Sequence, residues 1–204
     1  MKNATILLLV FSLLLACGKT TGKKENENTE LQTSKVAATD KPLPSADYSS
    51  LFINYECDMT AGEVAKVLNI PETDVSIPEF TQAGNCSFEI KGFGKNAQGG
   101  TILSWGATPF SKADSKKEIQ SALKDKENNE NIFGMDIELS ETGDCYIRIM
   151  PHIGRVNIYN ENYNGAFYFT YSQRGIYKRT EEEHAALGEK TIALANYLLK
   201  KHKK

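Results

Sequence analysis

Cysteine and histidine are the side chains of this sequence that could most readily support nucleophilic catalysis, and Cys145 lies seven residues before His152. A neighbouring imidazole can convert a cysteine thiol into a reactive thiolate. The alternation around Cys145, however, places it on the same strand face as Ile147 and Ile149, whereas His152 falls in the following turn. We therefore predict that Cys145 is a buried free thiol that packs as a small apolar group. A thiol enzyme that uses Cys145 is the alternative.

Other common motifs for catalysis or ligand binding are absent from the sequence. The three histidines of the sequence are His152, His184 and His202. None of them has a second His, Cys or carboxylate at a spacing typical of metal ligands, so no metal site is predicted. The segment Gly92-Phe93-Gly94-Lys95 lacks the spacing of a phosphate-binding loop. No G-x-S-x-G or S-x-x-K motif marks a nucleophilic serine. We predict no catalytic residue and no cofactor, with a hydrolase that uses another serine as an alternative.

The segment from Asp136 to Ser172 alternates apolar and polar residues, which predicts an antiparallel meander. If Met150 lies opposite Arg155, with 151–154 as the turn, the pairs that face each other are Ile149 with Val156, Ile147 with Ile158, Phe167 with Ile158, and Phe169 with Val156. This single register gathers the aliphatic and Phe side chains on one face. A slip by one residue would reverse the faces of a strand, so the agreement supports the register.

The same register places a mixture of aromatic, amide and guanidinium side chains on the opposite face: Tyr146, Arg148, Arg155, Asn157, Tyr159 and Tyr168. Such mixtures are enriched at binding surfaces, so this face is the candidate binding site. The alternative is an exposed sheet face on which Tyr serves only strand propensity. On either view, removal of Arg148 and Tyr159 is expected to cost little stability, because surface changes usually stay within about 0.5 kcal/mol.

Three helices must flank this sheet. Thr60, Ser111 and Thr180 each precede a carboxylate by three residues, the pattern of a helix cap, and apolar residues follow at helical spacing. Period-two alternation predicts strands at 86–90 and 101–105, joined by the Gly-rich segment 92–100. We predict an α+β fold, with an antiparallel sheet and three helices in a single domain.

The N-terminus decides the expected location. The apolar stretch from Ala4 to Leu15 is too short to span a membrane, and Leu14-Leu15-Ala16-Cys17 resembles a bacterial lipobox. That resemblance implies a signal peptide at 1–16, cleavage before Cys17 and a diacylglyceryl group on its sulfur, so that acyl chains anchor the protein to a membrane. Residues 17–50 read as the lipidated N-terminus and a disordered tether, and 51–204 as the globular domain. An ordinary secreted protein with an accidental cysteine is the alternative.

Three cysteines follow Cys17, which in an oxidising compartment means one pair and one free thiol. The motifs Cys57-x-x-Thr60-x-x-Glu63-Val64 and Cys86-x-Phe88, with a terminal helix rich in Ala and Leu, resemble a family of small bacterial envelope lipoproteins of unknown function. The resemblance implies a disulfide between Cys57 and Cys86 and an α+β sandwich domain, and it brings no catalytic residues. A bridge at this spacing would contribute roughly 3 to 4 kcal/mol in the chain-entropy model.

These observations predict a lipid-anchored protein of the cell envelope, on the periplasmic side of the outer membrane if the cell is Gram-negative. The non-catalytic domain would bind a partner protein or a small ligand. The near balance of 24 basic and 26 acidic residues gives no reason to expect a nucleic-acid partner. The alternatives are a thiol or hydrolytic enzyme and a purely structural component of the envelope.

Overall fold

The structure, a computed structural model, describes residues 46–79, 85–95, 99–130 and 132–204. Its α-helices are α1 (Ser49–Phe52), α2 (Ala61–Leu68), α3 (Lys112–Glu127) and α4 (Glu181–His202). The strands are β1 (Val75–Ser76), β2 (Cys86–Ile90), β3 (Thr101–Thr108), β4 (Asp136–Leu139), β5 (Tyr146–Met150), β6 (Arg155–Tyr159) and β7 (Ala166–Thr170). Short 3-10 helices are η1 (Glu72–Asp74), η2 (Ile132–Gly134), η3 (Pro151–Ile153) and η4 (Arg174–Tyr177).

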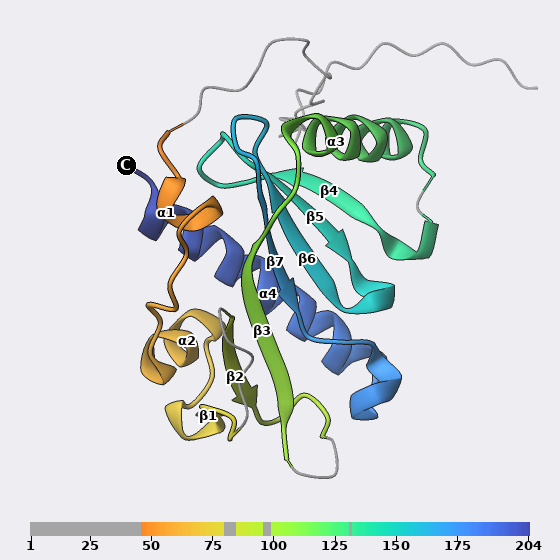
Figure 1. The fold of residues 1–204 in the computed structure, drawn as a ribbon. Coiled ribbons are helices and arrows are strands. Elements are labelled where there is room, and N and C mark those ends of the chain that lie inside the picture. The colour runs from red at the N-terminus through yellow and green to blue at the C-terminus, as the bar shows by residue number, and fades with distance from the viewer. Residues whose placement is uncertain (1–45, 80–84, 96–98, 131) are drawn as a thin grey trace, which may run out of the picture. The chain divides into compact units, whose positions relative to one another are not determined.

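The strands form one antiparallel sheet in the order β1-β2-β3-β7-β6-β5-β4 (Figure 1). The predicted α+β class is therefore confirmed. The predicted register of the meander is confirmed as well: Ile149 pairs with Val156, Ile147 with Ile158, and Phe169 with Val156. Alternation along the strands determined this register because only one alignment buries every aliphatic side chain on one face.

The three predicted helices begin at the predicted caps. Thr60 and Thr180 form capping boxes with Glu63 and Glu183, and the Ser111 hydroxyl accepts a hydrogen bond from the backbone N–H of Asp114. The structure adds the short helix α1, which the sequence did not predict. Because Tyr48 is fully buried, residues 46–50 belong to the folded domain and not to the predicted tether. Among the described residues, the folded part therefore includes 46–50 as well as the predicted range from 51 onward.

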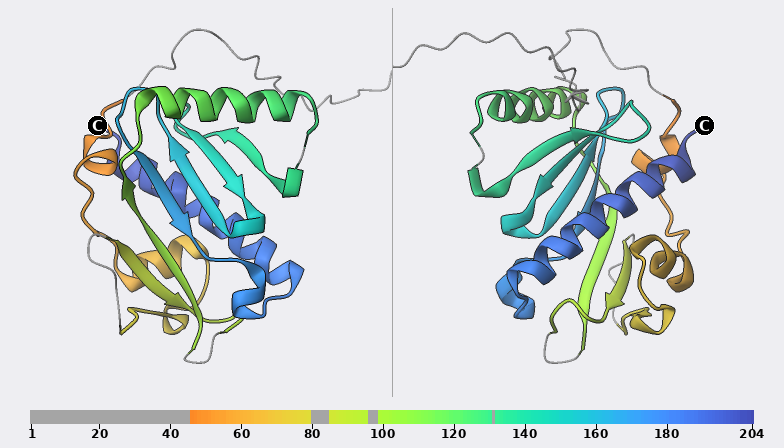
Figure 2. Two further views of the ribbon diagram at one scale, coloured as in Figure 1. Left: turned by 45° about the vertical axis from the view of Figure 1, so that its right-hand side comes forward. Right: turned by 180° about the vertical axis from the view of Figure 1, so that it is seen from behind.

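The sheet has a helix-covered inner face and a partly covered outer face (Figure 2). On the inner face, Val156, Ile158, Phe167 and Phe169 pack in one apolar cluster with leucines of α4 and with residues of α1 and α2. On the outer face, Ile119 and Ala122 of α3 pack over the β4–β5–β6 side of the sheet in a second cluster. No helix within the described ranges is long and apolar enough to cross a membrane.

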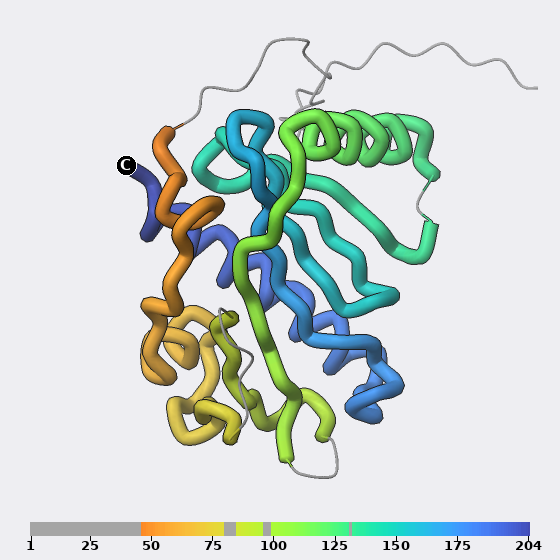
Figure 3. Tube along the Cα trace, in the orientation of Figure 1, coloured from red at the N-terminus to blue at the C-terminus, as the bar shows by residue number. Residues whose placement is uncertain are grey.

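The two ends of the described domain lie side by side, as the Cα trace shows (Figure 3). The backbone N–H groups of Asp47 and Lys204 each donate to the carbonyl of the other, at 3.2 and 3.1 Å. The Tyr48 hydroxyl donates to buried Asp144 at 2.7 Å. Burial of Asp144 acts to raise its pKa, but hydrogen bonds from Thr142 and Tyr48 hold the pKa below its ordinary value. Asp47 and Tyr48 are therefore held beside the C-terminal end of α4.

Candidate functional site

Helix α3 covers part of the predicted binding face. Tyr159 is only 4% exposed and belongs to the apolar cluster with Ile119 and Ala122 of α3, against which Tyr146 also packs. The ring of Phe110, just before α3, lies 5.6 Å from the Tyr159 ring. The prediction of an exposed face is therefore wrong for Tyr159, because the narrow apolar stripe of α3 packs on this face and encloses the tyrosine ring.

Arg148 is also tied to α3. Its Nη1 atom lies 2.5 Å from Oε2 of Glu118, and the Arg148 side chain is mostly buried. Removal of Arg148 together with Tyr159 would therefore break an ion pair and open the smaller apolar cluster. The expectation that this double change costs little stability does not fit the structure, since both side chains form part of the contact between α3 and the sheet.

The rest of the outer face lies outside the α3 cluster and forms an open patch of partly or fully exposed residues on β3, β6 and β7: Ser104, Arg155, Asn157, Tyr168 and Thr170. The Asn157 Nδ2 atom donates to the Tyr159 hydroxyl at 2.9 Å, and the Tyr168 hydroxyl donates to Asn85 at 3.0 Å. Three of the six predicted face residues, Arg155, Asn157 and Tyr168, thus remain in an accessible patch.

Two buried polar atoms border this open patch without a hydrogen-bond partner among the described residues. They are Nε of Arg148 and Oδ1 of Asn157, and these two residues are directly paired across β5 and β6. One is a donor and the other an acceptor. Buried polar groups are normally satisfied, but these two atoms have almost no accessible surface and so offer a ligand no direct contact.

Cys145 and His152 do not form a catalytic pair. Cys145 is a fully buried free thiol in the core cluster, as predicted, and burial raises its pKa to about 12. His152 lies in η3 beyond the other end of β5, where it is exposed and its ring lies 5.3 Å from that of Phe133. A protonated thiol in the core cannot serve as a nucleophile at neutral pH, and this geometry gives the thiol-enzyme alternative no support.

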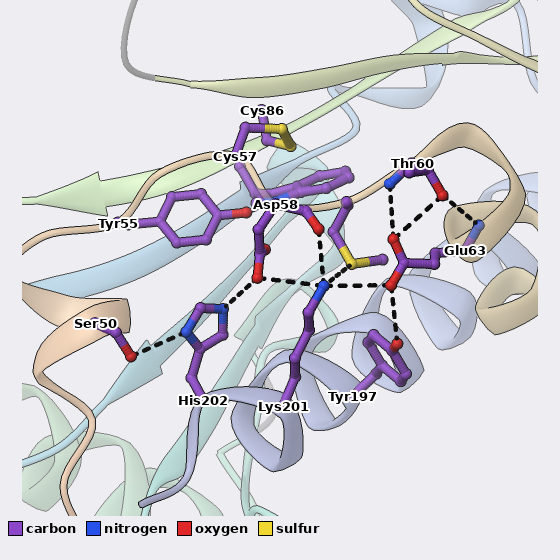
Figure 4. Close-up of polar contacts among 12 residues, drawn as sticks. Ser50, Tyr55, Cys57, Asp58, Thr60, Glu63, Cys86, Tyr197, Lys201 and His202 are labelled. Carbon is purple, nitrogen blue, oxygen red and sulfur yellow. Dashed lines mark hydrogen bonds and ion pairs between the residues drawn. A yellow bond between two sulfur atoms is a disulfide. The ribbon is translucent and has the colours of Figure 1, made fainter.

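The disulfide between Cys57 and Cys86 is present, with a Cα–Cα distance of 5.0 Å. Beside it lies a polar cluster that the sequence analysis did not find (Figure 4). Lys201 Nζ donates to the backbone carbonyl of Asp58 at 2.8 Å and lies 3.2 Å from the Asp58 carboxylate and 3.3 Å from that of Glu63. These contacts attach the end of α4 to the segment that precedes α2.

His202 lies in the same cluster between Ser50 and Asp58. Its Nδ1 atom is 3.0 Å from the Ser50 hydroxyl oxygen, and its Nε2 atom is 3.5 Å from Asp58 Oδ2. Burial lowers the pKa of His202, while the Asp58 carboxylate opposes that effect. A catalytic triad uses the two ring nitrogens in the opposite sense, with the carboxylate on Nδ1. We therefore interpret this arrangement as a structural contact that joins α1, α4 and the segment next to Cys57. We refer to the contacts of Lys201 and His202 as the polar clasp.

The lysines at the end of α4 have acidic partners in the same domain. Besides the Lys201 pairs, Lys200 contacts Glu141, and Lys203 lies 3.3 Å from Asp144. Each partner lies far away along the chain, so only the fold reveals that the charges of the tail are largely neutralised.

Arg179 is a buried side chain with many hydrogen bonds to other described residues, and 5% of its surface is exposed. Its guanidinium donates to oxygen atoms around the end of β7 and the turn after β2: the Phe93, Tyr171 and Ser172 carbonyls and the Thr101 hydroxyl. It also contacts Nδ1 of His184 at 3.2 Å and lies over the Tyr177 ring. The described residues contain no carboxylate that pairs with it, and they contain no cluster of side chains suited to a metal ion.

No family model matches the chain, and no curated protein or solved structure is significantly similar to it. The assignment of a site therefore depends on the geometry of the domain itself, and the open patch is the accessible feature that this geometry favours.

Proposed function

We propose that this protein is a lipid-anchored lipoprotein of the cell envelope whose domain binds a partner protein or a small polar ligand through the open patch. The observation that carries the binding proposal is the group of polar and aromatic side chains, Arg155, Asn157 and Tyr168, that α3 leaves accessible on β6 and β7. A ligand with an acceptor, such as an amide or a hydroxyl group, would accept a hydrogen bond from the exposed Arg155 guanidinium.

The disulfide supports the envelope location. Structural disulfides persist in oxidising compartments and are rare in reducing ones. The bridge between Cys57 and Cys86 closes a native loop with a sequence separation of 29 residues. Together with the lipobox-like sequence before Cys17, it favours a protein that is exported and then anchored.

We expect a photo-crosslinking residue in the open patch to capture the ligand in intact cells. p-Benzoylphenylalanine at Tyr168 should give a discrete adduct, because this partly buried aromatic side chain lies beside Asn157 across β7 and β6. The matched control places the same residue at Tyr197 on α4, which covers the other face of the sheet. Mass spectrometry then distinguishes a protein adduct from a small-molecule adduct.

The adduct should weaken when Arg155 is replaced by Ser, a change at an exposed position that leaves the core intact. Equal crosslinking at Tyr168 and Tyr197 would show that the patch has no selectivity. No adduct at either position would favour the purely structural role instead.

We also expect Cys17→Ala to abolish the lipid anchor, because the thiol is the atom to which the diacylglyceryl group would be attached. Labelled palmitate should enter the wild-type protein and not the variant, and only the wild-type protein should partition into detergent. Two or three acyl chains hold a protein to a membrane stably. If the protein is instead an ordinary secreted protein with an accidental cysteine at position 17, neither the wild-type protein nor the variant should incorporate palmitate.

A further inference from the structure

Two large apolar side chains lie exposed next to each other on the turn between α3 and β4. Phe133 is 72% exposed and Ile132 is 50% exposed. Both belong to η2, and we refer to these two residues as the apolar tip. Single exposed apolar residues are common on protein surfaces, but here an aromatic and an aliphatic residue that are neighbours in the chain are both exposed.

The backbone holds this projection in an unfavourable conformation. Phe133 has φ 57° and ψ 27°, in the left-handed region that bulky residues rarely adopt. A Cβ atom on Gly134 would lie 3.2 Å from the Pro151 ring, so the glycine lets η2 pack closely against η3. The Phe133 ring remains largely exposed, 5.3 Å from the His152 ring. Strain of this kind, retained at an exposed aromatic residue, suggests a function rather than a packing role.

The apolar tip and the start of the described chain lie at opposite ends of α4. Near the tip, His184 in the first turns of α4 contacts the Pro151 carbonyl at 2.7 Å through Nε2. At the other end, the backbone of Asp47 pairs with that of Lys204. From His184 to His202 the helix is roughly 27 Å long at 1.5 Å per residue. Both views of Figure 2 show this separation between the turn before β4 and the C-terminus.

We propose that Ile132 and Phe133 insert into the interfacial region of the membrane to which Cys17 anchors the protein. This inference depends on the proposed lipid anchor. The predicted tether between Cys17 and Ala46 lies outside the described residues; a flexible chain of about 28 residues would have a mean reach of about 30 Å. That reach matches the length of α4, so the anchor and the tip can engage one bilayer at the same time. The anchor then supplies the effective concentration that a small apolar contact needs.

A bilayer suits this surface better than a protein partner. Stable protein interfaces bury about 800 Å² on each side, far more than two side chains on a convex turn can offer. An aromatic ring and an aliphatic chain are the groups that settle at the boundary of head groups and acyl chains. Exposed Glu130 and Asp136 flank the tip, so attachment rests on apolar insertion and not on attraction to anionic lipid.

Tryptophan fluorescence can test the insertion in the lipidated full-length protein. The one native tryptophan, Trp105, is fully buried and gives a constant background. Phe133→Trp keeps an aromatic side chain at the tip. Ile77→Trp is the matched control, because Ile77 is 71% exposed in the segment after β1, and Ile53→Trp reports on the end near the tether. Each protein is reconstituted into vesicles of phosphatidylcholine and phosphatidylethanolamine, with and without brominated phosphatidylcholine.

The expected result is a blue shift and a loss of emission with brominated lipid for Phe133→Trp, and no change beyond the wild-type background for the two controls. Flotation of the same samples reports separately on the anchor. A floating protein with no quenching at residue 133 would overturn insertion of the tip while the anchor stands. Equal quenching at residue 77, or quenching at residue 53 alone, would also overturn it. Failure of the lipidated wild-type protein to float would refute the anchor, and the inference with it.

A second copy of the chain is the other occupant that the same reporter would detect. In that case the Phe133→Trp emission would shift to the blue with rising protein concentration in the absence of vesicles. That result, without quenching by brominated lipid, would show that the apolar tip forms a dimer contact and does not insert into the membrane. Quenching of the Phe133→Trp emission by brominated lipid that does not depend on protein concentration would exclude the dimer contact.

Discussion

Replacement of Arg179 by Met is expected to lower the free energy of unfolding by about 3 to 5 kcal/mol, because several buried acceptors lose their donors at once. The guanidinium satisfies the carbonyls of Phe93, Tyr171 and Ser172, which no apolar side chain can do. Burial also lowers the pKa of Arg179, which shows that the protein environment disfavours its charge. The hydrogen bonds, which the charge of the guanidinium strengthens, must therefore offset a desolvation cost.

Equilibrium unfolding in urea would measure this loss. Arg174→Met is the matched control, because Arg174 lies five residues earlier and forms an exposed ion pair with Glu181 at 2.8 Å. Such surface pairs contribute about 1 kcal/mol or less. Arg179→Lys should fall between the two, since a single ammonium group cannot reach acceptors on three sides. Equal effects of the Arg179 and Arg174 substitutions would show that the buried bonds contribute nothing net.

The local parts of the fold could be predicted because short stretches of sequence determine them. The caps at Thr60, Ser111 and Thr180 need only a hydroxyl and a carboxylate three residues apart. The meander register needs only a turn at 151–154 and alternating side chains on each side of it. In both cases the interacting residues are close along the chain, so the pattern itself carries the structural information.

The packing of α3 could not be predicted in the same way. Ile119 and Ala122 show that the helix has an apolar stripe, but nothing local indicates which face of the sheet the stripe covers. The candidate binding face was therefore too large, and Tyr159 was assigned to the surface. Tyrosine and arginine fit both an exposed face and a half-buried one, since an apolar body and a polar end suit either environment.

Long-range polar contacts were missed for a related reason. Lys201 and Asp58 are 143 residues apart, and Arg179 and Phe93 are 86 apart. A charged residue in a sequence is normally assigned to the surface, because Lys and Arg are rarely buried. No local pattern distinguishes Arg179 from the exposed Arg174 a few residues earlier. The difference arises only when β7 and the turn after β2 come together around the guanidinium.

Removal of the disulfide is expected to lower the free energy of unfolding by about 3 kcal/mol, because the bridge restricts the unfolded chain over a separation of 29 residues. The change is Cys57→Ala with Cys86→Ala, which avoids placing a hydroxyl at buried position 86. The fold should survive, since Lys201 still holds the Asp58 segment. Trp105 pairs with Cys86 across β2 and β3, so its fluorescence reports unfolding close to the lost bridge.

The reductant dithiothreitol separates the covalent bond from the side chains. It should lower the stability of the wild-type protein to that of the double variant and leave the double variant unchanged. Cys145→Ala is the control for the remaining thiol: because Cys145 forms no disulfide, that variant should lose as much stability on reduction as the wild-type protein does. If reduction destabilised the double variant equally, the reductant would act elsewhere. If reduction left the wild-type protein unchanged, the bridge would add no stability and the polar clasp at Lys201 and His202 would hold the segment by itself.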